Sequence, residues 1–252
     1  MKNKAIVLIA VRLNTKRLKK KALLNLYDKP LISSLTDRLK QSKLVSKIVW
    51  CTSKEQVDDK LETLAKKTKV RIFRGPSKDV MLRFILAAQK YKAKTVVRVT
   101  GDNPLTDPEI IDFLIKKHQD RQSDYTVCNS IPFGTRAEVI SLKALKKCHK
   151  ILIDPNSSEY MTWMLYKPRF FKVVDTISPN PKINRPEISL TVDYKKDHNN
   201  LKKIYKNFKG KVPRLESVIK WIDTNKLLLR SLTRKRITKR PRGINTNFKV
   251  NK

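Results

Sequence analysis

The sequence is poor in cysteine and has no long hydrophobic run, and both shortages exclude classes of protein. Its three cysteines, at positions 51, 128 and 148, lie far apart without the spacing of metal ligands. Their odd number also argues against a disulfide framework, so we expect reduced, half-buried thiols. The apolar run from Ala5 to Val11 is only seven residues long and ends at Arg12. Neither a signal sequence nor a membrane span fits such a run, so we expect a cytoplasmic protein.

Acidic residues are scarce as well. The chain of 252 residues has 22 acidic side chains against 58 lysines and arginines, a formal net charge of +36. Clustered basic residues bind nucleic-acid phosphates, but 41 of these are lysines spread over almost every expected helix. Nucleic-acid binding is therefore the less favoured interpretation. Charge is concentrated only between Arg12 and Lys21 and in the stretch after Asp223.

Short runs rich in β-branched residues alternate with amphipathic stretches through the first half of the chain. This alternation is typical of an α/β fold, in which βαβ units form a mostly parallel sheet with helices on both faces. The expected strands are 5–10, 48–51, 70–73 and 95–99, and the expected crossover helices are 30–41, 55–66 and 78–90. A further helix is expected to begin at Asp107 and Pro108, where an N-cap aspartate precedes a proline.

Beyond Tyr125 the rhythm changes, because prolines interrupt shorter elements. We expect an insertion or arm over about 130–186, then a strand at 189–192 and helices at 195–208 and 215–223. This divides the chain into one domain over 1–224 and a C-terminal tail over 225–252. The tail is basic and lacks a sustained apolar period, so we expect it to be flexible.

Glycine is also scarce, and the loop after the first expected strand contains none. A Gly-x-Gly-x-x-Gly fingerprint and a P-loop are therefore excluded there. Ligands of open α/β sheets bind beyond the carboxyl ends of the strands, so phosphate binding in this loop would depend on its cations. Arg12, Arg17 and Lys21 are suited to surround a triphosphate, since guanidinium groups bind phosphate bidentately and ammonium groups act as point charges. On spacing alone, a solvated basic loop is equally consistent.

Two aspartates follow strand-like runs and are candidate metal ligands. Asp102 comes after the strand ending at Val99 and after Gly101, which permits a close backbone approach. Asp193 ends the run Leu190 to Val192. Mg²⁺ is usually held by one or two carboxylates plus phosphate oxygens, so the pair would suit it if the two strands are neighbours. Aspartates at strand ends are helix caps at least as often as ligands.

Seven short motifs along the chain together resemble those of a known enzyme family. From about residue 5 to residue 224 the chain resembles the spore-coat-polysaccharide branch of the cytidylyltransferases, relatives of CMP-ketodeoxyoctulosonate and CMP-acylneuraminate synthetases. The resemblance rests on seven motifs in the family's order, namely Arg12-x-x-Thr15-x-Arg17-Leu18-x-x-Lys21, Lys29-Pro30-Leu31, Thr52-Ser53, Phe73-Arg74-Gly75 with Asp79-Val80, Arg98-x-Thr100-Gly101-Asp102-x-Pro104-Leu105-x-Asp107-Pro108, Glu138 and Leu190-Thr191-Val192-Asp193.

The resemblance implies a Rossmann-like fold of the nucleotide-diphospho-sugar transferase type and a homodimer formed through the mid-chain arm. It implies transfer of CMP from CTP to an acidic sugar, with a Mg²⁺ or Mn²⁺ ion on Asp102 and Asp193. It also implies a nucleotide site made of Arg12, Thr15, Arg17, Lys21, Thr52, Ser53, Arg74, Asp79 and Asp102, in which Arg12, Arg17, Lys21 and Asp102 act in catalysis. Glu138 and Glu159 would belong to the sugar end.

Some positions depart from the family pattern. Asn14 stands where glycine is common, and Lys19-Lys20 replaces a usual Pro-Gly. Ser158-Glu159-Tyr160 stands where Arg-Glu-His is typical. Arg136 stands where an acid usually precedes Glu138, and we hypothesise that Arg136 binds the sugar carboxylate while Glu138 accepts hydroxyl hydrogen bonds. If the segment is a strand, both side chains share a face. The competing interpretation is that Arg136 merely pairs with Glu138.

Three alternatives to the cytidylyltransferase function remain open from sequence. They are an inactive homologue that only binds nucleotide, a transferase using another triphosphate or a sugar phosphate, and a nucleic-acid binder that uses the basic segment 230–242. None of the three histidines, at 118, 149 and 198, is placed as a catalytic base, and we expect them at the surface. No Ser or Cys nucleophile with a partner base is evident either.

Overall fold

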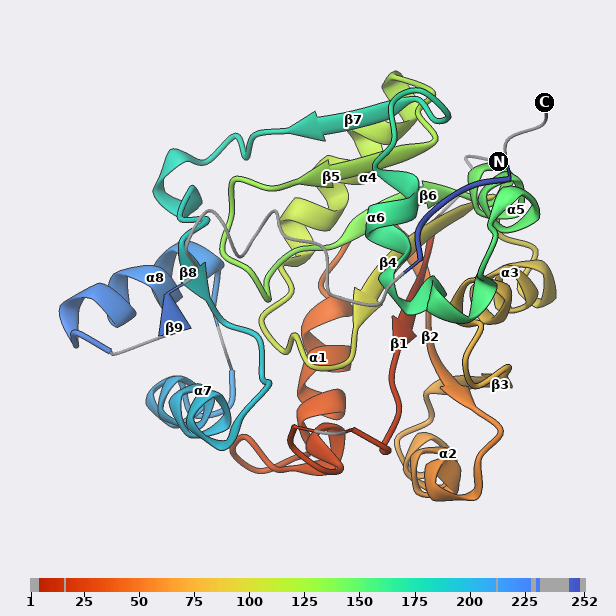
Figure 1. The fold of residues 1–252 in the computed structure, drawn as a ribbon. Coiled ribbons are helices and arrows are strands. Elements are labelled where there is room, and N and C mark those ends of the chain that lie inside the picture. Colours follow the sequence, from red (N-terminus) through yellow and green to blue (C-terminus); the bar gives the residue numbers. More distant parts are fainter. Residues whose placement is uncertain (1–4, 16, 212, 228–229, 232–244, 250–252) are drawn as a thin grey trace.

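The computed structural model describes residues 5–15, 17–211, 213–227, 230–231 and 245–249. Within them, the centre of the fold is a mixed seven-stranded sheet in the order β3-β2-β1-β4-β6-β5-β7 (Figure 1). Strand β6 runs antiparallel to its neighbours β4 and β5, and the other pairs are parallel. The strands are β1 (Ala5–Ala10), β2 (Val45–Ser53), β3 (Arg71–Gly75), β4 (Thr95–Thr100), β5 (Tyr125–Cys128), β6 (Glu138–Ser141) and β7 (Val173–Thr176). The prediction of a mostly parallel α/β sheet is confirmed.

Helices cover both faces of this sheet, and each face has its own apolar core. One core contains buried residues of α1 (Leu31–Leu39), α2 (Asp59–Lys67), α4 (Pro108–Asp120), α7 (Lys195–Asn207) and α8 (Leu215–Thr224). The other contains buried residues of α3 (Val80–Lys90), α5 (Leu142–Ile151) and α6 (Met161–Leu165). The 3-10 turns of the described residues are η1 (Lys21–Leu23), η2 (Gln56–Asp58), η3 (Pro155–Tyr160) and η4 (Pro181–Ile183).

The helix predicted from its start signal begins where expected. Asp107 caps α4, and its Oδ1 accepts hydrogen bonds from the backbone N–H groups of Glu109 and Ile110, each at 3.0 Å. Pro108 occupies the first turn. The caps therefore fix this boundary locally, as such signals do in general.

The segment expected as an arm is part of the main fold. Within 130–186 the chain supplies β6 and β7 to the sheet and α5 and α6 to one of its faces. Strands β6 and β7 are continuous with the rest of the sheet, because β6 pairs with β4 and β5 pairs with both β6 and β7. These elements belong to the same sheet as β1 to β4, and the expectation that an arm or insertion lies within 130–186 stays a prediction.

The strand expected at 189–192 is largely absent. Only Ile188–Ser189 is a strand, β8, and it pairs with β9 (Arg230–Ser231) in a separate two-stranded sheet. The backbone N–H of Leu190 donates to the Phe133 carbonyl at 2.7 Å, and that of Val192 donates to the Asp102 carbonyl at 2.9 Å. The segment therefore runs along the loops beyond the main sheet rather than inside it.

Gly134 makes this path possible. Its φ is +91, and a Cβ there would lie 2.3 Å from the backbone nitrogen of Thr191. No L side chain fits so close a contact, and the left-handed backbone conformation itself favours glycine. Gly134 thus lets the loop after β5 lie against the segment that leads to Asp193.

Residues 245–249 of the C-terminal tail pack on the domain. Phe248 is buried and contacts the rings of Phe170 and Phe171, with centroid distances of 4.7 and 6.1 Å. The N–H of Lys249 donates to the Ile151 carbonyl at 2.7 Å. This segment therefore packs on the domain, whereas the sequence suggested a flexible chain. The packing was not predicted because a single aromatic residue forms no apolar period.

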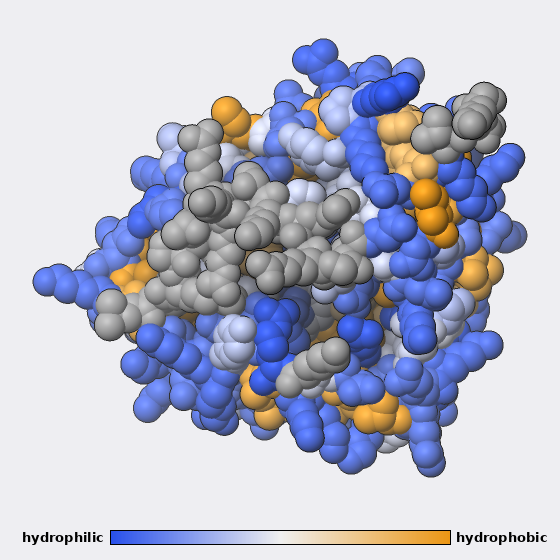
Figure 2. Space-filling model, viewed as in Figure 1, coloured by the Kyte–Doolittle hydropathy of each residue, from blue (hydrophilic) through white to orange (hydrophobic). Residues whose placement is uncertain are grey.

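No helix in the described part of the chain is both long and apolar enough to cross a membrane. The face shown in Figure 2 is mostly hydrophilic, with hydrophobic residues in small separate patches. This surface is what the lysine-rich composition predicts.

Candidate active site

Two aspartates and one lysine meet beyond the carboxyl ends of β1 and β4. The Lys21 ammonium donates to Asp102 Oδ2 at 2.6 Å, to the Val192 carbonyl at 2.8 Å and to Asp193 Oδ1 at 3.3 Å. Asp102 comes after β4, whereas Asp193 is held by the segment that hydrogen-bonds to the Asp102 backbone. The sequence predicted that these two carboxylates would lie close together if they followed neighbouring strands. They do lie close together, but Asp193 is carried by a loop and not by a strand next to β4.

Gly101 allows the ends of β1 and β4 to approach each other. Its N–H donates to the Ala10 carbonyl at 2.8 Å. A Cβ on Gly101 would lie 2.9 Å from the Cβ of Val11, which is closer than real Cβ contacts. The prediction that this glycine permits a close backbone approach is confirmed, and it places Asp102 beside the loop that carries Lys21.

The other two predicted phosphate-binding cations also contact carboxylates. Arg17 Nη1 donates to Asp193 Oδ2 at 2.9 Å, and Arg12 Nη2 donates to Glu159 Oε2 at 2.7 Å. The side chains of Arg12 and Arg17 are 46% and 55% exposed, so both remain open to a ligand from solvent. The basic loop is therefore directed at the ends of the strands rather than being a freely solvated segment.

Hydrogen bonds inside the loop fix its shape. The Thr15 hydroxyl donates to the Leu18 carbonyl at 2.6 Å, and the Lys20 N–H donates to the Leu13 carbonyl at 3.2 Å. Lys20 has a φ of 53, in the left-handed region that favours glycine. The Thr15 hydroxyl thus closes the loop, and the lysine stands at the position where the family pattern has glycine.

The charges of this cluster stabilise one another. Burial would raise the pKa of Asp102, but the Lys21 ammonium outweighs it by charge and hydrogen bonding, so the pKa lies below its ordinary value. Burial would lower the pKa of Arg17, but the carboxylate of Asp193 raises it above its ordinary value. Both groups are therefore ionised at neutral pH.

The two aspartates fit a hard divalent cation. In the described residues no group of three or more His, Cys, Asp or Glu side chains could hold a metal. Mg²⁺ needs fewer protein ligands than that, because it commonly takes one or two carboxylates and completes its shell with water and phosphate oxygens. Asp102 and Asp193 meet this requirement only together with a phosphate ligand.

Thr52 and Ser53, predicted around the nucleoside, are buried and bound to a carboxylate that sequence reasoning missed. Asp58 Oδ2 accepts from the hydroxyls of Thr52 and Ser53 at 2.7 and 2.5 Å. Its Oδ1 accepts from the backbone N–H of Leu13 at 2.8 Å. Asp58 therefore connects the end of β2 to the loop that carries the cations predicted to bind phosphate.

Arg74 braces the segment that follows β2. Its guanidinium donates to the carbonyls of Ser53 and Glu55, at 3.1 and 3.0 Å, and pairs with Asp59 and Glu62 at 2.7 and 2.9 Å. The charge of Arg74 is therefore already satisfied by protein groups. It shapes the predicted nucleoside region and is not a free cation.

Asp79 is held in a similar way. It caps α3 by accepting from the N–H of Leu82 at 2.9 Å, and it also accepts from Ser158 Oγ at 3.0 Å. His149 Nε2 lies 2.7 Å from its other oxygen. Asp79 thus anchors η3, the turn that bears Glu159.

Glu138, predicted for the sugar end, belongs to a half-buried polar cluster with Arg98. The two residues are cross-strand partners on β4 and β6, and Arg98 Nη1 donates to Glu138 Oε2 at 3.0 Å. The Thr162 hydroxyl donates to Glu138 Oε1 at 2.5 Å, and Arg98 Nη2 donates to the Glu159 carbonyl at 3.1 Å. Arg98 therefore connects the sheet to η3, a role that its place in the motif alone did not reveal.

Arg136 does not extend toward Glu138. Its guanidinium donates to the Ile131 carbonyl at 2.8 and 3.0 Å and to the carbonyl and side-chain oxygens of Asn129 at 2.9 and 3.2 Å. Burial lowers the pKa of Arg136 from its ordinary value. Because β6 begins only at Glu138, the assumption of a shared strand face does not apply. The described hydrogen bonds of Arg136 go to Asn129 and Ile131 rather than to Glu138, and its contact to a sugar carboxylate stays a prediction.

Two histidines are buried, contrary to the expectation of surface positions. His118 lies against the hydroxyls of Thr126 and Ser123 at 3.0 and 3.1 Å, and burial lowers its pKa to about 4. His198 is buried beside the Asn25 carbonyl at 3.0 Å, and burial lowers its pKa as well. Both histidines have structural partners and stand outside the ion cluster of Lys21. The three cysteines are likewise buried and free.

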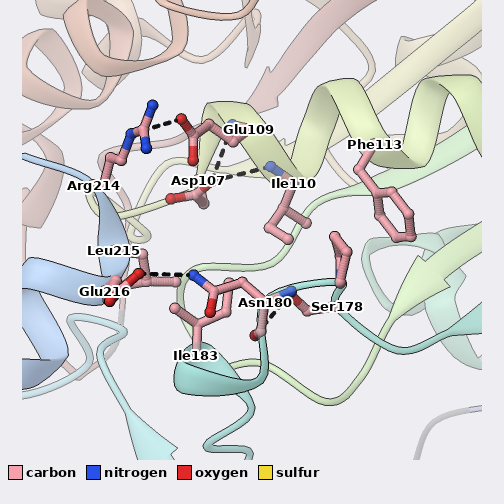
Figure 3. Close-up of a pocket in the computed structure, with 11 residues that line it drawn as sticks. Asp107, Glu109, Ile110, Phe113, Ser178, Asn180, Ile183, Arg214, Leu215 and Glu216 are labelled. Atoms are coloured by element: carbon pink, nitrogen blue, oxygen red, sulfur yellow. Dashed lines mark hydrogen bonds and ion pairs between the residues drawn. The ribbon is translucent and has the colours of Figure 1, made fainter.

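A small cavity of about 100 Å³ lies elsewhere, between the N-terminal ends of α4 and α8 (Figure 3). Its polar side chains pair with one another, since Arg214 contacts Glu109 at 3.0 Å and Asn180 donates to Glu216 at 3.0 Å. None of the residues predicted for the active site lines it. We therefore assign the site to the ion cluster and not to this cavity.

Comparison with known proteins finds a matching family model and similar relatives. The family model described as cytidylyltransferase matches residues 6–164, which include Asp102, Glu138 and Glu159. The chain is 34% identical to the uncharacterised protein MJ1063 of Methanocaldococcus jannaschii over 88% of this chain and 91% of that one. It is 32% identical to the spore coat polysaccharide biosynthesis protein SpsF of Bacillus subtilis, over 81% of this chain and 87% of that one.

The fold also has a similar solved structure. A cytidylyltransferase from Leptospira borgpetersenii superposes with a TM-score of 0.82 and 28% identity, covering 91% of this chain and 98% of that one. The similarity thus covers a larger share of the chain than the matched family segment 6–164.

Proposed function

The chain belongs to the cytidylyltransferase family, and on this premise we propose that it transfers CMP from CTP to an acidic sugar and releases pyrophosphate. The product would enter the synthesis of a surface polysaccharide or glycoconjugate, since the name of the relative SpsF refers to polysaccharide biosynthesis. The observation that carries the proposal is the convergence of Asp102, Asp193 and Lys21 on one point, with Arg12 and Arg17 on the same loop.

In the proposed reaction the acceptor oxygen attacks the α-phosphorus in line, and pyrophosphate leaves on the opposite side. Such a transfer needs little covalent help from the protein, so positioning and charge neutralisation dominate. Arg12, Arg17 and Lys21 would bind the phosphates and stabilise the charge that develops on the leaving pyrophosphate. Asp102 and Asp193 would hold Mg²⁺ or Mn²⁺, which supplies Lewis-acid stabilisation of phosphate oxygens and lowers the pKa of the acceptor hydroxyl.

The nucleoside would lie over the end of β2. Thr52 and Ser53 are engaged with Asp58, so they would present backbone atoms and a fixed surface to the base and ribose. Arg74 and Asp79 would hold the surrounding segments in place through the contacts described above. The buried network favours a rigid, preformed nucleoside site.

The sugar end would lie near Glu138 and Glu159. Glu138 is oriented by hydrogen bonds from Arg98 and Thr162, and Glu159 accepts a hydrogen bond from Arg12. The sequence hypothesis assigned the sugar carboxylate to Arg136, but the guanidinium of that residue is bound to loop carbonyls. Arg12 is the exposed guanidinium on this side, so we propose that it releases Glu159 and takes the acceptor carboxylate or a phosphate.

We also propose that the protein is a homodimer, as its family resemblance implies. In the described sheet β7 is an edge strand, and Ile177 directly after it is 70% exposed. Light scattering with Ile177→Lys tests this separately from catalysis, because β7 contributes no residue to the ion cluster.

The test of function is pyrophosphate release, measured with each of the four nucleoside triphosphates, Mg²⁺ and acidic sugars such as ketodeoxyoctulosonate or N-acetylneuraminate. We expect turnover with CTP and an acidic acceptor, and none without acceptor. Release with another triphosphate or with a sugar phosphate would replace the proposed substrates. Nucleotide binding without release under any condition would identify an inactive homologue. Asp102→Asn is the catalytic control, and Asp37→Asn is the matched control at an exposed ion pair.

A further inference from the structure

The Lys21 ammonium uses its full hydrogen-bonding capacity between the two predicted metal ligands. An ammonium group has three donors, and these reach Asp102 Oδ2, Asp193 Oδ1 and the Val192 carbonyl. The side chain is only 11% exposed, and the Asp193 side chain is 10% exposed. The cation is therefore held inside the site, in contrast to the half-exposed Arg12 and Arg17.

This position conflicts with a divalent cation on the same oxygens. Mg²⁺ binds oxygen ligands at about 2.0–2.1 Å, so an ammonium that already lies between the two carboxylates both occupies the space and repels the ion. We propose that Lys21 is a resident counterion, which a divalent metal has to displace before Asp102 and Asp193 can bind it. This inference rests on the metal site of the proposed function.

A triphosphate provides the new partner that Lys21 needs when it leaves. A lysine ammonium is a compact charge on a flexible stem, and phosphate oxygens are strong acceptors for it. Metal and triphosphate would therefore bind cooperatively, because each removes an obstacle to the other. By thermodynamic linkage the coupling is reciprocal, and couplings of this kind usually change affinity by about 5- to 150-fold.

The loop geometry favours a joint exchange. Lys21 begins η1, directly after Lys20 in its left-handed conformation. Arg17, on the same loop, binds the other oxygen of Asp193. These two contacts to Asp193 come from one short loop, and its movement toward phosphate would remove both cations from the carboxylate together.

The test measures binding of Mn²⁺ alone, by electron paramagnetic resonance of the free ion, to the wild type and to Lys21→Met and Lys21→Gln. Without nucleotide, both variants should bind Mn²⁺ about 5- to 150-fold more tightly than the wild type. Lys20→Met removes the same formal charge from an exposed neighbour and should change the affinity little. Adding Asp102→Asn to Lys21→Met should abolish the gain.

With CTP present the order should reverse, since the variants lack the lysine contact to phosphate while the wild type regains its carboxylates. Tripolyphosphate in place of CTP makes the same comparison without a nucleoside, so failure of the CTP assignment does not affect it. The proposal is overturned if the Lys21 variants bind Mn²⁺ no more tightly than Lys20→Met. It is also overturned if wild-type affinity for Mn²⁺ is the same with and without triphosphate, a measurement that needs no variant to fold.

Discussion

Asp58 offers the sharpest test of how the site is supported, because its carboxylate is completely buried and accepts hydrogen bonds from three residues. Its exposed fraction is 0%. Four donors point at it, namely the Leu13 N–H, both hydroxyls of Thr52 and Ser53, and the Ser53 N–H at 3.2 Å. We predict that Asp58→Asn destabilises the protein although the two side chains have almost the same shape.

The size of the expected loss in stability follows from the backbone N–H groups that Asp58 accepts from. An asparagine amide presents one NH₂ group, and in either orientation that group faces a backbone N–H, of Leu13 or of Ser53. The hydroxyls can rotate to accept, but a backbone N–H cannot. A buried donor left without acceptor costs about 1–3 kcal/mol, and bonds to a charged group are worth about 1.5–3 kcal/mol each. We therefore expect a loss of about 2–4 kcal/mol in the free energy of unfolding.

Urea unfolding at pH 7 measures this loss, and Asp59→Asn is the matched control. Asp59 is the next residue and pairs with Arg74 at 2.7 Å, but its side chain is 55% exposed. Exposed ion pairs contribute about 0–1 kcal/mol, so the control should lose little. A loss below about 1 kcal/mol in Asp58→Asn, or one equal to that of the control, would refute the reasoning. Because Leu13 belongs to the cation loop, the Michaelis constant for CTP should rise as well.

Four further predictions concern other parts of the molecule. Asp102→Asn and Asp193→Asn should each lower the turnover number about a hundredfold or more with little change in melting temperature, since each removes a formal charge from the site; full activity at saturating Mg²⁺ would contradict the metal assignment. Arg136→Ala should lower the free energy of unfolding by about 1–3 kcal/mol through its lost carbonyl contacts, with the Michaelis constants nearly unchanged; a selective rise for the sugar would restore the sequence hypothesis. Phe248→Ala should lower the melting temperature by a few degrees while CTP turnover stays within about threefold; an unchanged melting temperature would show that the packing of residues 245–249 contributes nothing. His118 has a pKa of about 4 in the folded state against about 6.5 in the unfolded state. The unfolded state therefore binds the proton first, and the free energy of unfolding falls as the pH drops from about 6.5 to about 4. His118→Asn should weaken this pH dependence of the free energy of unfolding in urea titrations, and an unchanged pH dependence would refute the prediction.

The sequence predicts the first half of the fold well because its signals there are local. The strand at Ala5–Ala10 is an unbroken apolar run, and the start of α4 depends on a capping aspartate and a proline within two positions. The strand expected at 189–192 is wrong for a physical reason. Its apolar residues satisfy the usual pattern, but the backbone hydrogen bonds of Leu190 and Val192 go to Phe133 and Asp102 outside the sheet.

Of the candidate site, the motif residues Arg17, Lys21, Asp102 and Asp193 come together, whereas the partners of the other motif residues could not be predicted. Asp58 lies in the short turn η2, and its donors come from the end of β2 and from the loop of Leu13, which is 45 positions away. The only local signal was an acid a few positions after Thr52 and Ser53. For Arg136 the shared face was expected only if the segment is a strand, and β6 begins only at Glu138, so the two-residue spacing does not predict the direction of the Arg136 side chain.

The cations of the phosphate loop are matched to acids that come from distant parts of the chain. Lys21, Arg17 and Arg12 reach carboxylates 81, 176 and 147 positions away. In a chain with so few acids, this pairing lets a strongly basic loop fold without its substrate, because uncompensated like charges would otherwise repel one another. In the proposed function the same pairs would have to be exchanged when a triphosphate binds, which would lower the affinity for any ligand that offers phosphate alone. A triphosphate with a divalent cation would satisfy the released cations and the released carboxylates together, so we expect this arrangement to favour the metal complex.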